Sequence, residues 1–255
     1  MVEFREVHKS FDVPVLAGVN LSIGTGEAIA IVGRSGTGKS VLLKTTIGLV
    51  EPDRGDVLVD GESVYHSDRG AVERIRRKVG YVFQHAALFD SMTVFDNVAQ
   101  GLPESELRRL PRREVLERVA DALEHVNLPP NAVLTKLPAE LSGGMRKRVG
   151  LARAIVGRPE ILLYDEPVTG LDPVNGAVVH RLIDRLAQEL GVTSVIVTHD
   201  VEGALDIVDR VAMLDEGRIT FVGTPHEFRQ SGEPLVRAFM ERLPQVESAR
   251  MLELA

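Results

Sequence analysis

Residues 33–40, Gly-Arg-Ser-Gly-Thr-Gly-Lys-Ser, have the spacing of a phosphate-binding loop. They lie between a short apolar run and a helical pattern, the context that the motif G-x-x-x-x-G-K-[ST] requires. The glycines permit positive φ, so backbone N–H groups and the next helix N-terminus can point at one anion. An ordinary glycine-rich turn would not need the Lys-Ser ending. We predict a nucleoside triphosphate site formed by Gly33, Arg34, Ser35, Gly36, Thr37, Gly38, Lys39, Ser40 and Val41.

Two carboxylates end the apolar run at 161–164. At the carboxyl end of a central strand, Asp165 would face the phosphate loop and support Mg²⁺ through water. Glu166 follows immediately and points elsewhere, so it can act on the water that attacks the γ-phosphorus, as general base or as orienting group. The alternative is an acidic turn, which the presence of a phosphate loop disfavours. Lys39 would reach the β and γ phosphates, and the Ser40 hydroxyl would hold Mg²⁺.

Two more polar residues end neighbouring apolar runs. His199 follows the run at 195–198, and its ring could hydrogen-bond a γ-phosphate oxygen and fix the water. Gln84 closes the run at 81–83, where an uncharged amide can touch the metal or the water. The alternative for His199 is a purely structural role, and Gln84 taken by itself is only a weak indication of a site. We predict Glu166, His199 and Lys39 as catalytic residues and Ser40, Gln84 and Asp165 as the metal site.

A second anion-binding device stands far from the first along the chain. Ser142 has the character of a helix N-cap, and Gly143 and Gly144 would expose backbone N–H groups at a positive helix end. One chain has no obvious need for two such devices. We therefore expect the second device to complete the site of a second copy, in a closed head-to-tail dimer that holds two nucleotides.

These motifs, in this order, resemble the nucleotide-binding subunit of an ABC transporter over about residues 1–225. The resemblance implies that Phe11 stacks on adenine, that Asp172 lies in a loop linking the two sites, and that Gln84 borders a groove for the membrane subunit. A core position for Phe11 is the alternative. Met145 stands where glutamine is usual, and Thr169-Gly170 replace the usual Ser-Ala. Neither change removes a phosphate-contacting group.

Four longer sequence segments resemble the ATPases of Mla/MCE-type lipid transport systems in particular. They are residues 35–44, 88–98, 141–145 and 165–173. The resemblance implies phospholipid transport, an integral membrane permease, an MCE-type substrate-binding partner and a place on the cytoplasmic face of the inner membrane. An importer of amino acids or other metabolites is the alternative. A soluble ABC ATPase and a small-molecule kinase are rivals from other classes. The first usually has coiled-coil arms, zinc cysteines or two cassettes, and the second has no use for residues 141–145.

The elements that must position these residues follow from the apolar patterns. Runs over 2–7, 19–23, 27–32, 56–60, 79–83, 161–164 and 193–198 indicate strands, and 211–214 with 218–222 indicate a hairpin. Helical patterns cover 39–49, 94–101, 112–126, 142–156, 174–190 and 201–208. This alternation predicts an α/β fold. We expect a P-loop NTPase (RecA-like) core with a mixed sheet over 1–87 and 158–225, an antiparallel β subdomain and a helical subdomain inserted over 88–157.

Composition sets the outer limits. The 255 residues contain no cysteine, which excludes a disulfide framework and a thiolate metal site. A net charge of −7 argues against a nucleic-acid partner, and no run reaches the ~18 apolar residues of a bilayer span. We read the basic clusters near Arg74 and Arg108 as solvated helix faces. A C-terminal segment, 226–255, is expected to hold a helix with Leu235, Phe239 and Leu243 on one face. It would pack on the core or reach a partner subunit.

Overall fold

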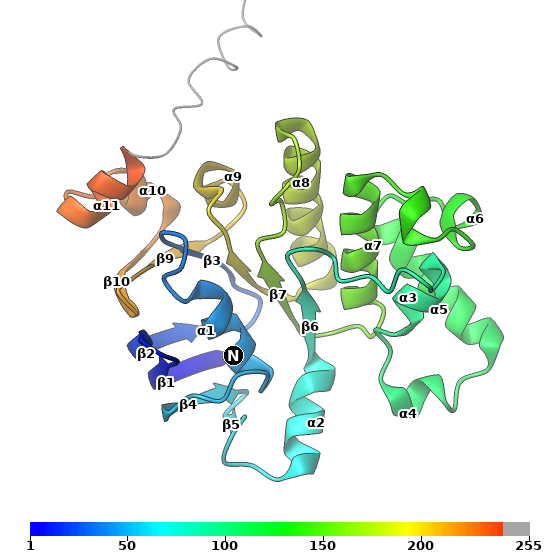
Figure 1. Ribbon diagram of the computed structural model, residues 1–255, viewed down its shortest axis with the longest axis horizontal. Helices are drawn as coiled ribbons and strands as arrows, with labels where there is room; N and C mark the ends of the chain where they lie inside the picture. Colours follow the sequence, from blue (N-terminus) through cyan, green and yellow to red (C-terminus); the bar gives the residue numbers. More distant parts are fainter. Residues whose placement is uncertain (242–255) are drawn as a thin grey trace, which may run out of the picture.

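The computed structural model describes residues 1–241, and its centre is a six-stranded sheet with the order β10-β9-β3-β8-β7-β6 (Figure 1). Neighbouring strands are parallel except β9 and β10, which pair antiparallel. The strands are β3 (Ala28–Val32), β6 (Val79–Val82), β7 (Ile161–Asp165), β8 (Thr193–Val197), β9 (Arg210–Asp215) and β10 (Arg218–Gly223). The predicted α/β fold with a mixed sheet is confirmed.

Strands β3, β7 and β8 are buried at every residue, which is why each reads as a continuous apolar run. Their parallel register places Val82 of β6 beside Tyr164 of β7, and Asp165 beside Val197 of β8. The carboxyl ends of these strands therefore meet at one edge of the sheet. Polar residues that follow each strand are brought together there.

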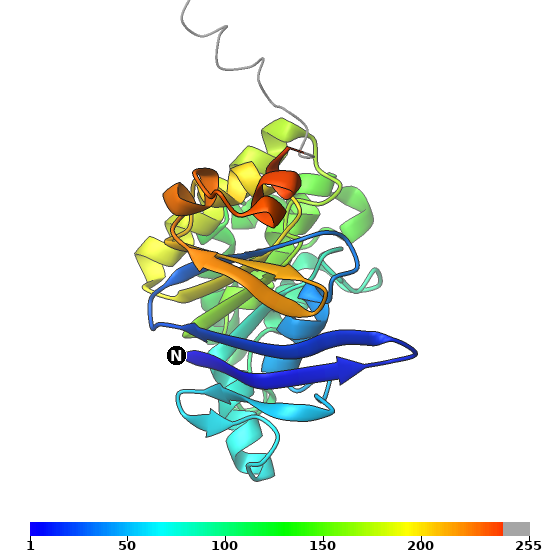
Figure 2. The same cartoon turned by 90° about the vertical axis from the view of Figure 1, so that its left-hand side faces the viewer.

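A second sheet is antiparallel and has the order β2-β1-β4-β5. It crosses the lower part of the molecule in Figure 2. Its strands are β1 (Val2–Ser10), β2 (Pro14–Ile23), β4 (Arg54–Val59) and β5 (Glu62–Ser63). The Ala17 N–H donates to the Gly217 carbonyl at 2.8 Å, which joins this sheet to the β9–β10 turn. An apolar cluster that includes Phe4, Ile29 and Leu163 fills the space between the two sheets.

A group of helices lies on one side of the central sheet, opposite the antiparallel sheet (Figure 1). Its members are α3 (Val94–Ala99), α4 (Glu104–Leu107), α5 (Arg112–His125), α6 (Pro130–Val133), a short 3-10 turn (Pro138–Glu140) and α7 (Gly143–Ile155). Thr93 and Asp96 form a capping box at α3, and the Ser142 hydroxyl caps α7. The apolar core of this group continues into β7 and α8. The subdomain boundaries at 88 and 157 therefore stay a prediction.

The remaining helices connect and flank the strands. They are α1 (Lys39–Thr46), α2 (Arg69–Lys78), α8 (Pro173–Leu190), α9 (Val201–Leu205), α10 (Pro225–Arg229) and α11 (Pro234–Met240). Helix α1 ends before the predicted residue 49 because Gly48 adopts a φ of 67° and its N–H bonds back to the Thr45 carbonyl. Arg74 on α2 pairs with Glu62, and Arg108 at the C-terminal end of α4 pairs with Glu104, as expected of solvated faces. Within residues 1–241, no helix has both the length and the apolarity of a bilayer span.

Helix α11 corrects one prediction. Val236 is its buried residue, and Phe239 and Met240 pack on the same apolar cluster, whereas Leu235 is 39% exposed. The inward face thus holds Val236, Phe239 and Met240 at i, i+3 and i+4, so Phe239 faces inward as predicted and Val236 takes the place of Leu235. Leu243 lies outside the described residues. The helix packs on its own core, beside β3 and β9.

Candidate nucleotide-binding site

The phosphate loop, residues 33–40, connects β3 to α1, and its backbone requires glycine at two positions. At Gly33, with a φ of 154°, an added Cβ would lie 2.2 Å from the Leu214 carbonyl oxygen. At Gly38, with a φ of 98°, it would lie 2.9 Å from the Val15 carbonyl oxygen. No side chain caps α1. The first N–H groups of this helix are therefore left for an anion in the loop.

Lys39 stands inside this loop. Only 5% of the residue is exposed, and its Nζ donates to the carbonyl oxygens of Gly33 at 2.8 Å and Arg34 at 2.9 Å. Burial lowers the pKa of Lys39, and the negative charges of Glu166 and Asp165 oppose that shift. The ammonium is thus held at the centre of the loop, where it is within the field of both acids.

Ser40 and Asp165 form the oxygen-rich part of the site. The Ser40 hydroxyl donates to Asp165 Oδ1 at 2.6 Å, and the Tyr81 hydroxyl donates to Asp165 Oδ2 at 2.9 Å. Burial, followed by the charge of Asp165, raises the pKa of Tyr81, so its hydroxyl remains a donor. A hydroxyl beside a carboxylate is the donor set that Mg²⁺ prefers, so these residues fit the predicted ion. Sequence reasoning did not assign Tyr81 to the site.

Glu166 is bonded to His199. His199 Nδ1 lies 2.6 Å from Glu166 Oε2, and the same oxygen accepts the His199 backbone N–H at 3.2 Å and the Thr169 hydroxyl at 3.1 Å. The Glu166 backbone has a φ of 51°, and its N–H donates to the Val197 carbonyl. Three contacts therefore fix Oε2. The arrangement orients the carboxylate and leaves Oε1 outside these contacts, as an acceptor for water.

Gln84 follows β6 at the same sheet edge. Its backbone carbonyl accepts a hydrogen bond from the ammonium of Lys147 on α7. The Gln84 loop, residues 84–87, contains two non-glycine residues in the left-handed region, Ala86 with a φ of 59° and Ala87 with a φ of 47°. The structure thus places Gln84 near the acids, and its role toward the metal or water stays a prediction.

The Ser-Gly-Gly segment, residues 142–144, forms the start of α7. The Ser142 hydroxyl accepts the Met145 N–H at 3.2 Å, and Ser142 and Gly143 are exposed. A Cβ on Gly143 would meet Leu171, and one on Gly144 would meet Asn175 at 3.2 Å. The neighbours of these two glycines thus lie just before α8 and in its first turn, and the phosphate loop is not among them. Asp172 caps α8 and is bonded to Asn175.

Phe11 lies in the turn between β1 and β2. The residue is 60% exposed, which excludes the alternative of a core phenylalanine. Lys9 Nζ lies 5.6 Å from the ring centroid. The following strand β2 contacts the phosphate loop through Val15, which lies against Gly38. The ring is therefore free to stack on a flat ligand, and its role toward adenine stays a prediction.

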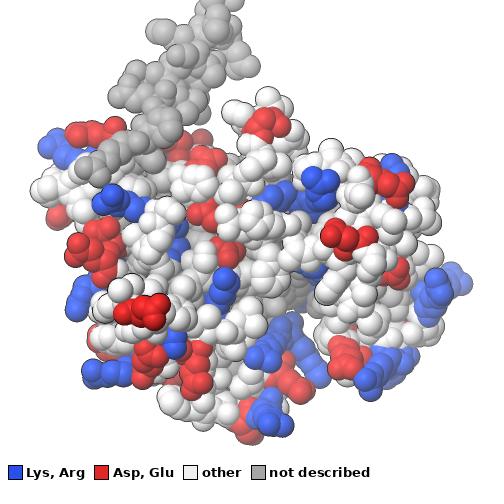
Figure 3. All heavy atoms as spheres, in the orientation of Figure 1, with Lys and Arg blue, Asp and Glu red and all other residues white. Residues whose placement is uncertain are grey.

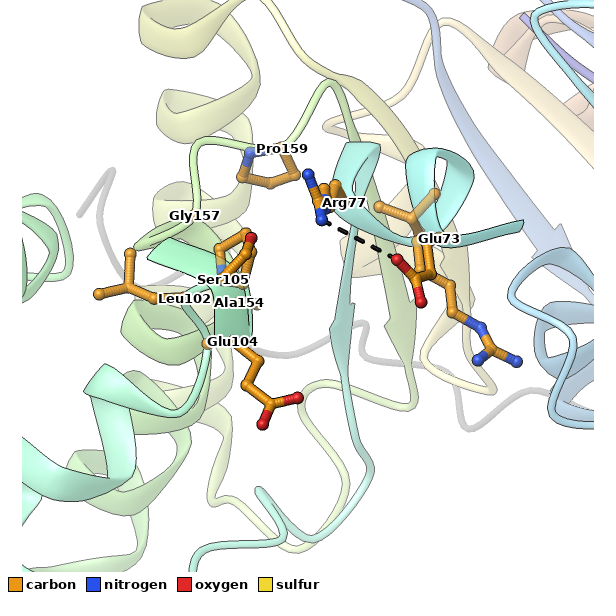
Figure 4. Close-up of a pocket in the computed structure, with 12 residues that line it drawn as sticks. Glu73, Arg77, Leu102, Glu104, Ser105, Ala154, Gly157 and Pro159 are labelled. Carbon is orange, nitrogen blue, oxygen red and sulfur yellow. Dashed lines mark ion pairs between the residues drawn. The ribbon is translucent and has the colours of Figure 1, made fainter. Parts of the chain in front are cut away.

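A cavity of about 400 Å³ lies away from these residues, between α2, the segment 101–105 and the end of α7. Figure 4 shows Glu73 and Arg77 on one wall and Leu102, Glu104 and Ser105 on the other. Basic side chains gather near it, over α2 and around α4 in the lower part of Figure 3, with acidic side chains between them. None of its lining residues belongs to the predicted site. The cavity is therefore separate from the predicted nucleotide site.

Comparison with known proteins gives a consistent result. The family model described as ABC transporter matches residues 16–169. The methionine import ATP-binding protein MetN of Xanthomonas campestris pv. campestris (strain 8004) is 40% identical, over 98% of this chain and 75% of that protein.

Two solved structures are similar over most of the chain. The dimeric post-hydrolysis state of the ATP-binding cassette MJ0796 bound to ADP and Pi is 32% identical, with a TM-score of 0.79 over 88% of this chain and 99% of that one. The structure of cbiO1 from Clostridium perfringens, part of the complex cbiONQ, is 31% identical, with a TM-score of 0.80 over 99% and 98%. This likeness confirms the predicted fold class.

Proposed function

Since this chain belongs to the ABC transporter family and is an ATPase subunit within it, we propose that it drives an importer of a small metabolite. Amino acids are the first class to test. The observation that carries the proposal is the assembly of a phosphate loop, two strand-end acids and a histidine at one sheet edge. The 40% identity to a methionine import protein supports the cargo class.

Lipid transport of the Mla/MCE type is the second candidate function. The sequence words at 88–98 and 141–145 favour it, and the relatives compared above do not support it. The methionine import protein extends beyond the matched region, since the chain covers 75% of it. Because none of the relatives compared above is named as a lipid transporter, the lipid cargo and the MCE-type partner stay predictions.

The chemistry proposed for one site uses groups that the structure already orients. The N–H groups of the phosphate loop and Lys39 hold the β and γ phosphates and stabilise charge on the transferred phosphoryl group. A Mg²⁺ ion bound by Ser40, Asp165 and Gln84 would neutralise phosphate charge. Glu166, fixed at Oε2 by His199, accepts a hydrogen bond from the attacking water through its other oxygen and takes its proton.

The second half of each site comes from a second copy of the chain. The Ser-Gly-Gly segment presents N–H groups at the positive end of α7, yet the neighbours of Gly143 and Gly144 are Leu171 and Asn175 and not the phosphate loop of its own chain. In a head-to-tail dimer, this segment would lie against the phosphate loop of the partner and cover the γ-phosphate. The dimeric cassette with ADP and Pi is a precedent for such an arrangement.

The cavity between α2 and residues 101–105 is proposed as the contact site for a loop of a membrane subunit. One wall belongs to the central α/β part and the other to the helical group (Figure 4). A change in the distance between these two parts would therefore move the contacts of an occupant. The complex that contains cbiO1 is a precedent for a partner. Such contacts would hold the chain at the cytoplasmic face of the inner membrane.

Affinity purification of the Glu166→Gln protein, with ATP, from detergent-solubilised membranes of the source cell tests this function. Mass spectrometry should identify an integral permease without bound phospholipid, and the wild-type complex should hydrolyse ATP. Stoichiometric phospholipid together with an MCE-domain protein would instead establish the lipid reading. Recovery of the chain without any membrane protein would favour a soluble ABC ATPase.

A further inference from the structure

One face of α7 contacts the Gln84 loop through three residues spaced three apart, Lys147, Gly150 and Arg153. Lys147 donates to the Gln84 carbonyl. At Gly150 an added Cβ would lie 3.2 Å from the Ala86 Cβ, so only glycine permits this approach without displacement. Arg153 donates from Nη2 to the Ala86 carbonyl at 2.6 Å and from Nη1 to the Ala87 carbonyl at 2.7 Å. Three successive positions along the helix thus hold one loop.

The loop held in this way is strained. Ala86 and Ala87 both adopt positive φ, a backbone conformation that is unfavourable for an L-residue other than glycine. Such a conformation persists only where surrounding contacts impose it. The carbonyl groups of three of the loop's four residues accept hydrogen bonds from α7. The helix therefore determines the path of the loop.

These contacts use one buried cation, Lys147, and one half-buried cation, Arg153. Lys147 is 7% exposed, and burial lowers its pKa while the charge of Glu166 opposes that shift. Burial also lowers the pKa of Arg153. A buried charge is a poor source of stability compared with an apolar side chain of similar volume. Lys147 is bonded to Gln84 and lies within the field of Glu166, which indicates a role other than stabilising the fold.

We propose that Lys147 is a positioning residue for the hydrolysis site: its bond to the Gln84 carbonyl makes the location of α7 determine where Gln84 stands beside Asp165 and Glu166. The Ser-Gly-Gly segment begins the same helix, and Gly143 lies one helical turn before Lys147. Contact of that segment with a partner's nucleotide is thereby transmitted to the Gln84 loop. This inference rests on the proposed ATPase function.

Steady-state kinetics of Lys147→Met test the proposal, with Arg148→Met as matched control. Arg148 is the next cation on α7 and donates to the Asn127 carbonyl, away from the Gln84 loop. We expect Lys147→Met to lower kcat roughly 10-fold, as loss of a positioning contact does. ATP affinity and Tm should stay at or above wild-type values. Lys147→Arg should restore most of kcat, and Arg148→Met should match wild type.

A second measurement reports the loop directly. The chain has no tryptophan, so His85→Trp in the Gln84 loop gives a single fluorescent probe. We expect acrylamide to quench this probe more strongly in the Lys147→Met background than in the wild-type or Arg148→Met background. This comparison needs no turnover and applies to any folded fraction.

Equal quenching in all three backgrounds, or a wild-type kcat in Lys147→Met, would overturn the inference. If Lys147→Met lowered both kcat and Tm, and Lys147→Arg restored neither, Lys147 would act in folding alone and the inference would also fail. The proposed function fails differently, through a wild-type chain that hydrolyses no ATP.

Discussion

The phosphate-loop region and the Ser-Gly-Gly segment are both built to bind anions, yet they differ in how complete they are within one chain. In the first region each functional group already has a partner: Lys39 the loop carbonyls, Ser40 the carboxylate of Asp165, and Glu166 the ring of His199. In the second region Ser142 and Gly143 are exposed at a helix end. The reacting groups are thus preorganised within one chain, and the exposed helix end supports the proposal that assembly of two chains controls their use.

The physical basis of this difference is the element that carries each region. Strands buried on both faces fix their register, so residues at their carboxyl ends are placed to within a hydrogen bond. A helix end at the surface fixes only the direction of its N–H groups. Such an end can join a second surface without rearrangement of the core.

The largest effect should come from Glu166→Gln, which removes the proton acceptor in the preorganised region. We expect kcat for ATP hydrolysis to fall about 10³-fold, in the range of general-base contributions. ATP affinity should be retained, because the phosphate loop is unchanged. Single-turnover assays with equilibrium ATP binding would check this. A variant that keeps the full hydrolysis rate would refute the role of Glu166.

A smaller loss of kcat is expected from Ser142→Arg, which alters only the Ser-Gly-Gly segment. We expect kcat to fall roughly 10²-fold, the scale for loss of one set of transition-state donors. The isolated chain should bind ATP as wild type does, because Ser142 does not touch its own phosphate loop. Calorimetry with ATP and sedimentation of the ATP-bound protein would check both points. Weakened ATP binding by the monomer would argue that both devices serve one nucleotide.

The smallest effect should come from Tyr81→Phe, which removes one supporting bond from the preorganised region. Asp165 Oδ2 would lose its phenolic donor at a cost of about 1–3 kcal/mol in unfolding free energy. We expect a few-fold loss of kcat as well. Tyr65→Phe is the matched control, since the Tyr65 hydroxyl lies within hydrogen-bond distance of the Thr45 and Val50 carbonyl oxygens and away from Asp165. Urea unfolding should show a loss for both variants, and ATPase assays a loss for Tyr81→Phe alone.

Sequence reasoning reached the two regions unequally. The phosphate loop, Asp165, Glu166 and His199 could be placed because each follows an apolar run, and parallel strands bring such ends together. Tyr81 was missed because its partner Asp165 is 84 residues away and nothing in its own strand marks the contact. The strain at Ala86 and Ala87 was also invisible, since alanine does not signal a left-handed backbone. The contact of Lys147 with Gln84 depends on how α7 packs, which periodicity alone does not give.

The most direct test mixes two inactive chains, Glu166→Gln and Ser142→Arg. If each site combines the phosphate loop of one chain with the Ser-Gly-Gly segment of the other, a mixed dimer has one site with both defects and one intact site. Random exchange then restores about a quarter of the wild-type hydrolysis rate, since half of the dimers are mixed and each has one working site of two. Activity no greater than that of the separate variants, in a mixture shown to contain mixed dimers, would contradict the account.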